Sequence, residues 1–366
     1  MRRAALAAPG LALLAVGVAP AAADAPTAAL EKWNEISAAA FAGPDLLALD
    51  TETVQVRRRL PGGRRGPLEF TYYKTDLVGV GLTAARRRFA RGAFDTRIAI
   101  RNSIGSQSGA RLMTGGGGAS VVLPGAHGFA PPVVWCCTPA GVEVVVESDG
   151  RADAPRALAA GLDGTRVRML LRSADGSVAL ASAAPGLLAN PDDLDASRTS
   201  APFPGRPSGT LAAVADGLVA WTEDPASGVV RHGTPSDAGV AAVADARFGG
   251  RVLRVWAAPG TVVALVRAGR VASVRTLDVA SGAVRTVWRG TTLPRVAVGG
   301  GAVAVADGRR ILAARGGTAR RVALARGPVA AVAVDGDRVA WFERLVIRRG
   351  GAPARWTVAR LARVPG

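Results

Sequence analysis

The sequence predicts an all-β protein, a β-propeller of four-stranded antiparallel blades, with seven blades favoured and eight as the alternative. One observation behind this prediction is a repeated phrase, "AVADGLVAWTE" at 213–223 and "VAVDGDRVAWFE" at 332–343. A second is the Asp-Gly pair between two short apolar runs in each phrase, a strong hairpin signal because that turn requires positive φ. A third is the recurrence of related phrases about every 40 residues.

The spacing is measured from the residue that takes the tryptophan position in each phrase. Four clear repeats follow one another in steps of 44, 40 and 36 residues, with anchors at Trp221, Leu265, Val305 and Trp341. Fainter matches upstream bring the series to eight anchors by adding Leu180, Trp135, Ile100 and Leu49. A period near 40 with several short strands per unit is typical of a β-propeller.

The final repeat divides into four predicted strands. "VAAVAV" and "RVAWFE" flank the Asp-Gly turn, and "RLVIRRG" and "ARWTVARLAR" follow as the third and fourth strands. The first strand would lie nearest the axis, where small residues such as Ala330 and Ala333 fit the narrow hub. Trp288 and Trp356 fall on predicted fourth strands, where bulky side chains can fill the outer rim.

The first 23 residues have the pattern of an export signal. Arg2 and Arg3 precede an apolar run, and three alanines provide a cleavage site before Asp24. No later stretch reaches the roughly 20 apolar residues that a membrane helix requires. We therefore expect a mature protein that is secreted or periplasmic, at the cell envelope, with no transmembrane segment after cleavage.

The segment 24–43 does not continue the repeat, and two interpretations of it stay open. Leu30, Trp33 and Ile36 have helical spacing, which indicates a short helix ended by Gly43 and Pro44. The alternative is a strand that pairs with the last blade and closes the ring. The propeller itself is predicted to occupy 44–366.

The strand-turn-strand phrases around Trp221, Leu265, Val305 and Trp341 resemble the degenerate WD40-like and TolB-type β-propeller repeats of exported bacterial proteins. The resemblance covers residues 165–366 well and 44–165 weakly. The Trp-Asp and Gly-His pairs of WD40 repeats are absent, and the "SPDG" turn of TolB-type repeats is reduced to Asp-Gly. The resemblance implies the fold, export and a binding platform, and it transfers no catalytic residue.

The chain is strongly basic, with a net charge of +18 and 46 basic residues, all arginine except Lys32 and Lys74. Two interpretations compete: a surface that attracts anions, and codon bias, which replaces lysine by arginine. The arginine runs are the best anion-binding candidates: Arg57, Arg58, Arg59, Arg64, Arg65, Arg86, Arg87, Arg88, Arg348 and Arg349. Few aromatic residues lie among them, which argues against specific nucleic-acid binding.

Cys136 and Cys137 are adjacent and are the only cysteines. Neighbouring residues of a strand point to opposite faces, so a disulfide between them would require a distorted peptide. Export would permit oxidation. A Cys136–Cys137 disulfide, two separate thiols and a bond to another chain are therefore all retained.

Signals for catalysis are weak. The only histidines, His127 and His232, exclude a three-histidine zinc site, and no G-x-S-x-G elbow accompanies them. Asp175, Asp216 and Asp335 are expected in first hairpins on one side of the disc, but each precedes glycine, where turn chemistry alone explains aspartate. No metal or cofactor is expected.

These observations favour an exported, monomeric, non-catalytic binding or scaffold module that recognises a protein or an anionic envelope polymer. The alternative is a propeller enzyme, a glycosidase or lyase, with carboxylates in the central channel. The predicted innermost strands "LAAVA", "RVAV" and "VAAVAV" carry no carboxylate, which favours binding.

Overall fold

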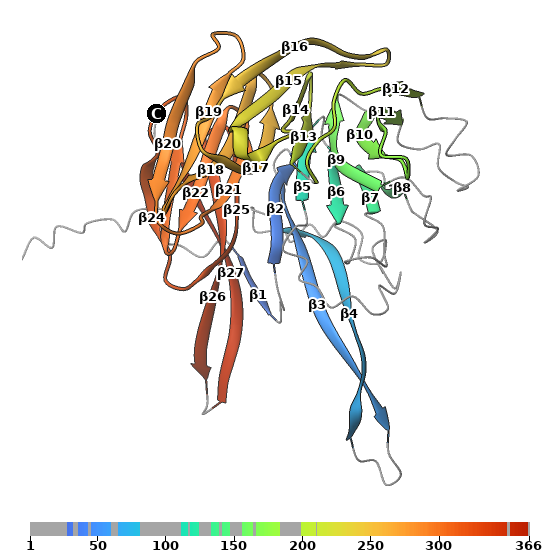
Figure 1. Cartoon of the computed structure of the whole chain (residues 1–366). Coiled ribbons are helices and arrows are strands. Elements are labelled where there is room, and N and C mark those ends of the chain that lie inside the picture. The colour runs from blue at the N-terminus through green and yellow to red at the C-terminus, as the bar shows by residue number, and fades with distance from the viewer. Residues whose placement is uncertain are drawn as a thin grey trace, which may run out of the picture.

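The computed structural model describes residues 28–31, 36–42, 45–59, 65–80, 111–115, 118–123, 133–138, 141–146, 156–163, 166–183, 199–209, 211–349 and 352–364. These residues form seven antiparallel sheets that follow one another around the molecule (Figure 1). Within this described part, six sheets have four strands and the first has three. The protein is a β-propeller, and the seven sheets are its blades.

The blades of the first half are short-stranded except for one long hairpin. Blade 1 holds β2 (Ile36–Ala42), β3 (Asp45–Arg59) and β4 (Arg65–Val80). Blade 2 holds β5 (Arg111–Gly115), β6 (Gly118–Leu123), β7 (Val133–Thr138) and β8 (Gly141–Val146). Blade 3 holds β9 (Arg156–Asp163), β10 (Arg166–Arg172), β11 (Val178–Ala183) and β12 (Thr199–Pro202).

The blades of the second half follow the same order of strands. Blade 4 holds β13 (Ala212–Ala215), β14 (Leu218–Trp221), β15 (Val229–Ser236) and β16 (Gly239–Arg247). Blade 5 holds β17 (Arg251–Ala258), β18 (Thr261–Ala268), β19 (Val271–Asp278) and β20 (Val284–Gly290). Blade 6 holds β21 (Arg295–Gly299), β22 (Ala302–Asp307), β23 (Arg310–Ala314) and β24 (Arg320–Leu324). Blade 7 holds β25 (Val329–Asp335), β26 (Arg338–Arg349), β27 (Ala352–Arg363) and β1 (Ala28–Glu31).

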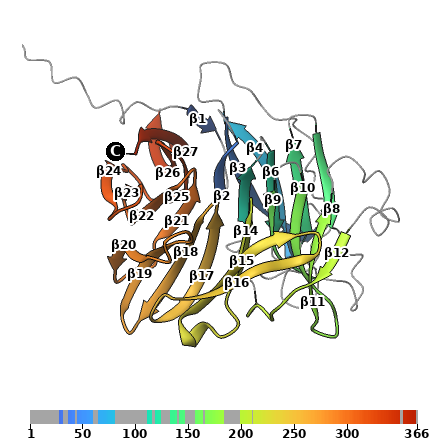
Figure 2. The same cartoon turned by 90° about the horizontal axis from the view of Figure 1, so that it is seen from above.

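The first strand of each blade lies innermost, next to the first strands of its neighbours. β2, β5, β9, β13, β17, β21 and β25 contact one another in this order, and β25 also contacts β2 (Figure 2). The first and last blades share a core cluster that joins Ile36 and Phe41 to Ala333 and Phe342. Blades 7 and 1 are therefore direct neighbours.

The segment 24–43 contributes strands where the structure describes it. β1 pairs with β27 of the last blade, from Ala28 opposite Ala359 to Glu31 opposite Trp356. β2 is the innermost strand of blade 1, and Ile36 and Phe41 are buried. The expected boundary at residue 44 falls between β2 and β3, so the first blade takes its innermost strand from this segment.

Two of the predicted anchors lie one strand away from the expected place. Five of them lie on second strands as predicted: Leu49, Trp221, Leu265, Val305 and Trp341. Trp135 and Leu180 lie instead on the third strands β7 and β11, and Ile100 is outside the described residues.

The shift in blade 3 has a local reason. Asp175-Gly176 is the turn between β10 and β11, the second hairpin, and another Asp-Gly pair at 163–164 separates β9 from β10. The expectation that Asp175 shares a side of the disc with Asp216 and Asp335 is thus wrong. Asp175 fulfils a turn role, since its Oδ1 accepts hydrogen bonds from the backbone N (2.9 Å) and Oγ (2.7 Å) of Ser177, and these bonds lower its pKa.

The last blade also differs from the four consecutive strands predicted for it. "RVAWFE" and "RLVIRR" form one continuous strand, β26, because no Gly or Pro interrupts them before Gly350. β27 is therefore the third strand, Trp356 lies on it, and β1 supplies the fourth. Trp288 does lie on a fourth strand, β20.

The repeated tryptophans pack between neighbouring blades. Trp221 is fully buried among residues of blades 3 and 4, with the Phe203 ring edge-on at a centroid distance of 4.6 Å. Trp341 is buried in the same way among residues of blades 6 and 7. The phrase is repeated because each copy places a bulky tryptophan side chain between its own blade and the preceding one. Gly217 (φ 65°) and Gly336 (φ 58°) form the tight turns before these two tryptophans, with the positive φ that the Asp-Gly signal predicts.

Candidate binding face

Two hairpins extend well beyond the blades that carry them. β3 pairs with β2 only as far as Asp50, so its residues 51–59 continue with β4 alone. β26 pairs with β25 only as far as Glu343, so its residues 344–349 continue with β27. At a rise of roughly 3.3 Å per residue these arms are about 30 and 20 Å long. Both project from the same side of the disc, from neighbouring blades (Figure 1).

Most of the predicted anion-binding arginines lie on these two arms. Arg57, Arg58, Arg59 and Arg65 lie near the tip of the first arm, where Arg59 is opposite Arg65 in the strand register. Arg348 and Arg349 lie at the tip of the last arm, opposite Pro353 and Ala352. Arg64 and Arg86, Arg87 and Arg88 lie outside the described residues. The fold thus brings two sequence-distant arginine runs to one side of the molecule.

A larger basic surface lies on blades 5–7, on the same side of the disc as the arms, and was not predicted from the sequence. Strands alternate in direction within each blade, so the second hairpin and the connector to the next blade emerge on one face. We define the connector face by six such stretches of blades 5–7 and their borders: 247–251, 267–271, 289–295, 307–310, 324–329 and 344–349. These stretches contain one carboxylate, Asp307, and twelve arginines: Arg247, Arg251, Arg267, Arg270, Arg289, Arg295, Arg309, Arg310, Arg326, Arg344, Arg348 and Arg349.

The turns on the opposite face of the same blades carry fewer arginines and more carboxylates. These turns span 258–261, 278–284, 299–302, 314–320 and 335–338. They contain three arginines and three aspartates: Arg315, Arg320, Arg338, Asp278, Asp335 and Asp337. Codon bias acts on the whole chain and does not distinguish one face of a disc from the other. The asymmetry is therefore a property of this surface.

One pair of arginines opposes the local stability of the sheet. Arg251 of β17 lies directly opposite Arg267 of β18, and both side chains are exposed. Like charges directly opposite one another destabilise a strand pair. A local rule broken without a compensating carboxylate is expected at functional surfaces.

Exposed aliphatic side chains lie among these arginines. The described residues include five large hydrophobic side chains that are exposed, and four belong to the connector face: Val271 (45%), Leu293 (55%), Leu324 (56%) and Val346 (67%). The fifth, Val243, lies on the outermost strand of blade 4. The connector face therefore combines positive charge with exposed apolar surface.

Several guanidinium groups hold the connectors in place while their side chains remain exposed. Arg295 Nε donates to the carbonyl of Val329 (2.9 Å), and Arg309 Nε donates to the carbonyl of Ala325 (2.7 Å). Arg310 pairs with Asp307 across one turn. The face is thus anchored to the blades by part of its own arginines.

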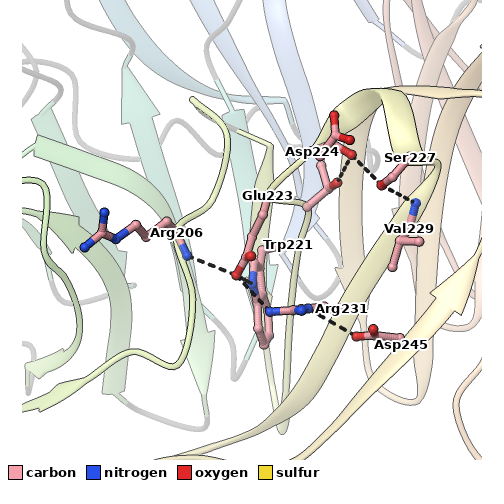
Figure 3. Close-up of polar contacts among 9 residues, drawn as sticks. Arg206, Trp221, Glu223, Asp224, Ser227, Val229, Arg231 and Asp245 are labelled. Carbon is pink, nitrogen blue, oxygen red and sulfur yellow. Dashed lines mark hydrogen bonds and ion pairs between the residues drawn. The ribbon is translucent and has the colours of Figure 1, made fainter.

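The basic surface gives way to an acidic cluster at blade 4 (Figure 3). Glu223 Oε1 accepts hydrogen bonds from the backbone N of Arg206 (3.2 Å), from Trp221 Nε1 (3.4 Å) and from Arg231 Nη1 (3.0 Å). Arg231 Nε also lies 3.3 Å from Asp245 Oδ1. Positive and negative charges alternate here, which sets one limit to the basic surface.

The short 3-10 helix η5 (Pro225–Ser227) begins in the same region. Asp224 caps it by accepting a hydrogen bond from the backbone N of Ala226 (2.9 Å). Ser227 Oγ in turn donates to the carbonyl of Asp224 (2.7 Å). The carboxylates of Glu223, Asp224 and Asp245 thus all have hydrogen-bond or ion-pair partners within the protein.

The remaining candidates have no site built around them in the described residues. His232 lies buried on β15, and burial lowers its pKa while Asp245 opposes this shift; His127 is outside the described part. Cys136 and Cys137 lie on β7, where the backbone of both residues pairs with the neighbouring strands β6 and β8. Where the structure is described, no three His, Cys, Asp or Glu residues gather as a metal site would require. The same residues contain no helix long and apolar enough to span a membrane.

No protein-family model matches the chain, and no curated protein matches its sequence. Solved structures do match its fold. The WD40 repeats of RRP9 are 10% identical, and the match covers 93% of this chain and 99% of that chain with a TM-score of 0.53. U3-55K is 9% identical, with coverage of 91% and 98% and a TM-score of 0.49. The β-propeller domain of the Trilobed protease from Pyrococcus furiosus is 10% identical, with coverage of 89% and 96% and a TM-score of 0.47.

At these identities the likeness concerns the fold alone. The chain has a β-propeller fold similar to that of WD40 repeat proteins. Its function has to be argued from its own surface.

Proposed function

We propose that this protein is an exported, non-catalytic binding module of the cell envelope that takes an anionic partner on the connector face and between its two arms. The observation that carries the proposal is the charge asymmetry of blades 5–7, with twelve arginines and one carboxylate in the connector-face stretches against three arginines and three aspartates in the turns of the opposite face. A dense positive surface raises the local concentration of anionic partners and steers their approach.

The enzyme alternative depends on carboxylates in the central channel. In the described innermost strands the carboxylates are Asp163 and Asp335, each the last residue of its strand before a turn. Two turn residues of blades 3 and 7 do not make a flanking carboxylate pair of the kind that glycoside hydrolysis requires. The described innermost strands therefore favour binding over glycoside hydrolysis.

The binding proposal is tested with inorganic polyphosphate as a soluble polyanion and with an anionic envelope preparation. The chain beginning at Asp24 should bind both, and the affinity should fall steeply as salt increases, because exposed charges are screened within about 10 Å at 0.1 M. Each arginine near an anionic surface contributes about 1 kcal/mol. The double variants Arg251→Gln/Arg267→Gln and Arg348→Gln/Arg349→Gln should therefore each weaken binding roughly 10- to 30-fold.

A matched control is available on the opposite face. Arg315→Gln/Arg320→Gln also removes two exposed positive charges and leaves the connector face unchanged. It should weaken binding by less than threefold. Equal losses from the control and the face variants would mean that net charge alone is responsible, and binding indifferent to salt would remove the proposal altogether.

The export part of the proposal has its own test. The chain expressed in a bacterial host should be recovered outside the inner membrane with Asp24 as its first residue, as determined by intact-mass measurement. Recovery of an intact Met1 chain from the cytoplasm would contradict export. That result would not affect the binding measurements.

A further inference from the structure

We propose that the partner is a folded acidic protein with an apolar patch, which docks on the connector face beside the last arm. This inference rests on the proposed function and specifies the partner class. The side chains that carry it are the exposed aliphatic residues of the connector face, together with the arginines that flank them.

Each exposed aliphatic residue has an arginine next to it. Leu293 lies in the connector between Arg289 and Arg295, and Leu324 is opposite Arg310 in the strand register. Likewise, Val271 follows Arg270, and Val346 lies on the last arm between Arg344 and Arg348. Aliphatic side chains surrounded by arginine are typical of protein–protein interfaces, where arginine is enriched and apolar residues are desolvated.

A flexible polyanion does not account for this composition. Arginine side chains alone can neutralise a chain of phosphates or carboxylates. Such a chain offers little apolar surface to bury, so its binding gains little from Leu293 or Leu324. Where side-chain exposure is described on this face, the exposed large hydrophobic residues are all leucine or valine. The aliphatic residues instead fit an apolar patch on a protein.

The arms argue against a flat lipid surface. Val346 lies three residues beyond Glu343, or about 10 Å along the arm, whereas Leu293 and Leu324 lie at the level of the blades. The tips of the two arms project further in the same direction (Figure 1). A planar bilayer that touched the tips would not reach Leu293 or Leu324, but a convex partner can contact the arm and the blades together.

A second copy of this chain does not complement the face. The chain carries a net charge of +18, and the turns on the opposite face of blades 5–7 have no net negative charge, with three arginines and three aspartates. Charge complementarity requires a partner with a net negative surface. An acidic protein meets both the charge and the apolar requirements.

The test places a photo-crosslinking residue, benzoylphenylalanine, at three positions of the full chain expressed in its host. The positions are Leu293, Leu324 and Val346, and the matched control is Val243, an exposed valine on the rim of blade 4. The three connector-face positions should yield one shared adduct of discrete mass that is digested by protease and is more acidic than the parent chain. The adduct should be reduced at least fivefold by Arg251→Gln/Arg267→Gln, and Val243 should not yield it.

A second pair of variants separates this inference from the proposed function. Leu293→Ser/Leu324→Ser should change the affinity for polyphosphate by less than twofold, because neither substitution alters charge, and should abolish the crosslink from Val346. Protease-resistant smears, adducts of twice the chain's own mass, equal adducts from Val243, or no adduct would each overturn the acidic-protein inference while salt-dependent anion binding stands. Loss of salt-dependent binding to polyphosphate and to the envelope preparation would instead overturn the proposed function.

Discussion

Glu343 and Arg360 form an ion pair inside the last blade, with side chains that are 0% and 4% exposed. The other carboxylate oxygen of Glu343 accepts hydrogen bonds from the backbone N of Arg326 (2.6 Å) and of Gly327 (3.5 Å). A single carboxylate thus ties the incoming connector to the second and third strands of blade 7. Blade 4 repeats the arrangement at its surface with Glu223, the backbone N of Arg206, and Arg231.

Glu343→Gln should destabilise the fold strongly. The substitution removes the carboxylate that pairs with the buried Arg360 guanidinium, and breaking a buried ion pair in this way costs about 3–5 kcal/mol. The prediction is checked by urea unfolding of the chain beginning at Asp24. The midpoint should fall with little change in the slope of the transition.

Glu223→Gln is the control for that measurement, because the pair of Glu223 with Arg231 (3.0 Å) has side chains that are 36% and 38% exposed. Exposed pairs contribute at most about 1 kcal/mol. Similar losses from both variants would show that the burial of Glu343 has no special role.

Gly300→Ala should be more damaging than Gly301→Ala. Both glycines have positive φ, 56° and 72°, so alanine is strained by about 1–2 kcal/mol at either position. A Cβ at Gly300 would also lie 2.1 Å from the backbone N of Gly336, where the turn of blade 6 approaches that of blade 7, whereas nothing lies within 4 Å at Gly301. Thermal unfolding should therefore show a larger loss for Gly300→Ala, and equal melting temperatures would contradict the close approach of these turns.

The second half of the propeller could be predicted from sequence because two signals coincide there. Apolar alternation and an Asp-Gly turn both mark the strands before Trp221 and Trp341, and the structure has hairpins at both places. The same dipeptide at Asp175 belongs to a second hairpin, and nothing local in the sequence tells one hairpin of a blade from another. This ambiguity explains why Leu180 was assigned to a second strand although it lies on the third strand β11.

The arms were partly predictable and the connector face was not. Consecutive arginines such as Arg348 and Arg349 are visible in the sequence, but the continuity of β26 through Glu343 was missed because "RVAWFE" already completes a strand of ordinary length. Arg251, Arg270 and Arg289 are separated by 19 residues at each step and meet on one face only because strands alternate in direction. The sequence signal that would have predicted the connector face is an arginine that recurs at half the repeat period, at the positions of the second hairpins and of the connectors.

Replacing β1 by a sequence that pairs poorly should uncover the edge of β27. β1 has only four residues and pairs with 356–359 of the 12-residue strand β27. In a variant with Gly-Ser-Gly-Ser at 28–31, those amides of residues 356–359 that face β1 should exchange with deuterium at least tenfold faster, because local opening governs exchange. An unprotected edge also promotes association between chains, so light scattering should rise with concentration.

The amides of Val263 and Ala264 in blade 5 serve as internal controls for this variant, since β1 does not contact them. Their exchange should be unchanged. Unaltered protection of every amide in residues 356–359 would show that the pairing of β1 is dispensable.

His232 should make the fold less stable in mild acid. Burial lowers the pKa of this imidazole below its ordinary value of 6.5, and Asp245 offsets only part of the shift. The unfolded chain therefore binds a proton more readily than the folded chain, so the free energy of unfolding rises with pH in this range. Stability should be complete above pH 6.5 and should decline as the pH falls through the lowered pKa, with a slope of at most about 1.4 kcal/mol per pH unit.

Urea unfolding of the wild type, His232→Gln and His127→Gln from pH 5.5 to 8 checks this prediction, because few carboxylates titrate in that window. His232→Gln should lose the decline below pH 6.5, and His127→Gln should retain it. If the curves for wild type and His232→Gln remain parallel, the proton taken up on unfolding belongs to another group, and the buried imidazole does not control the acid sensitivity of blade 4.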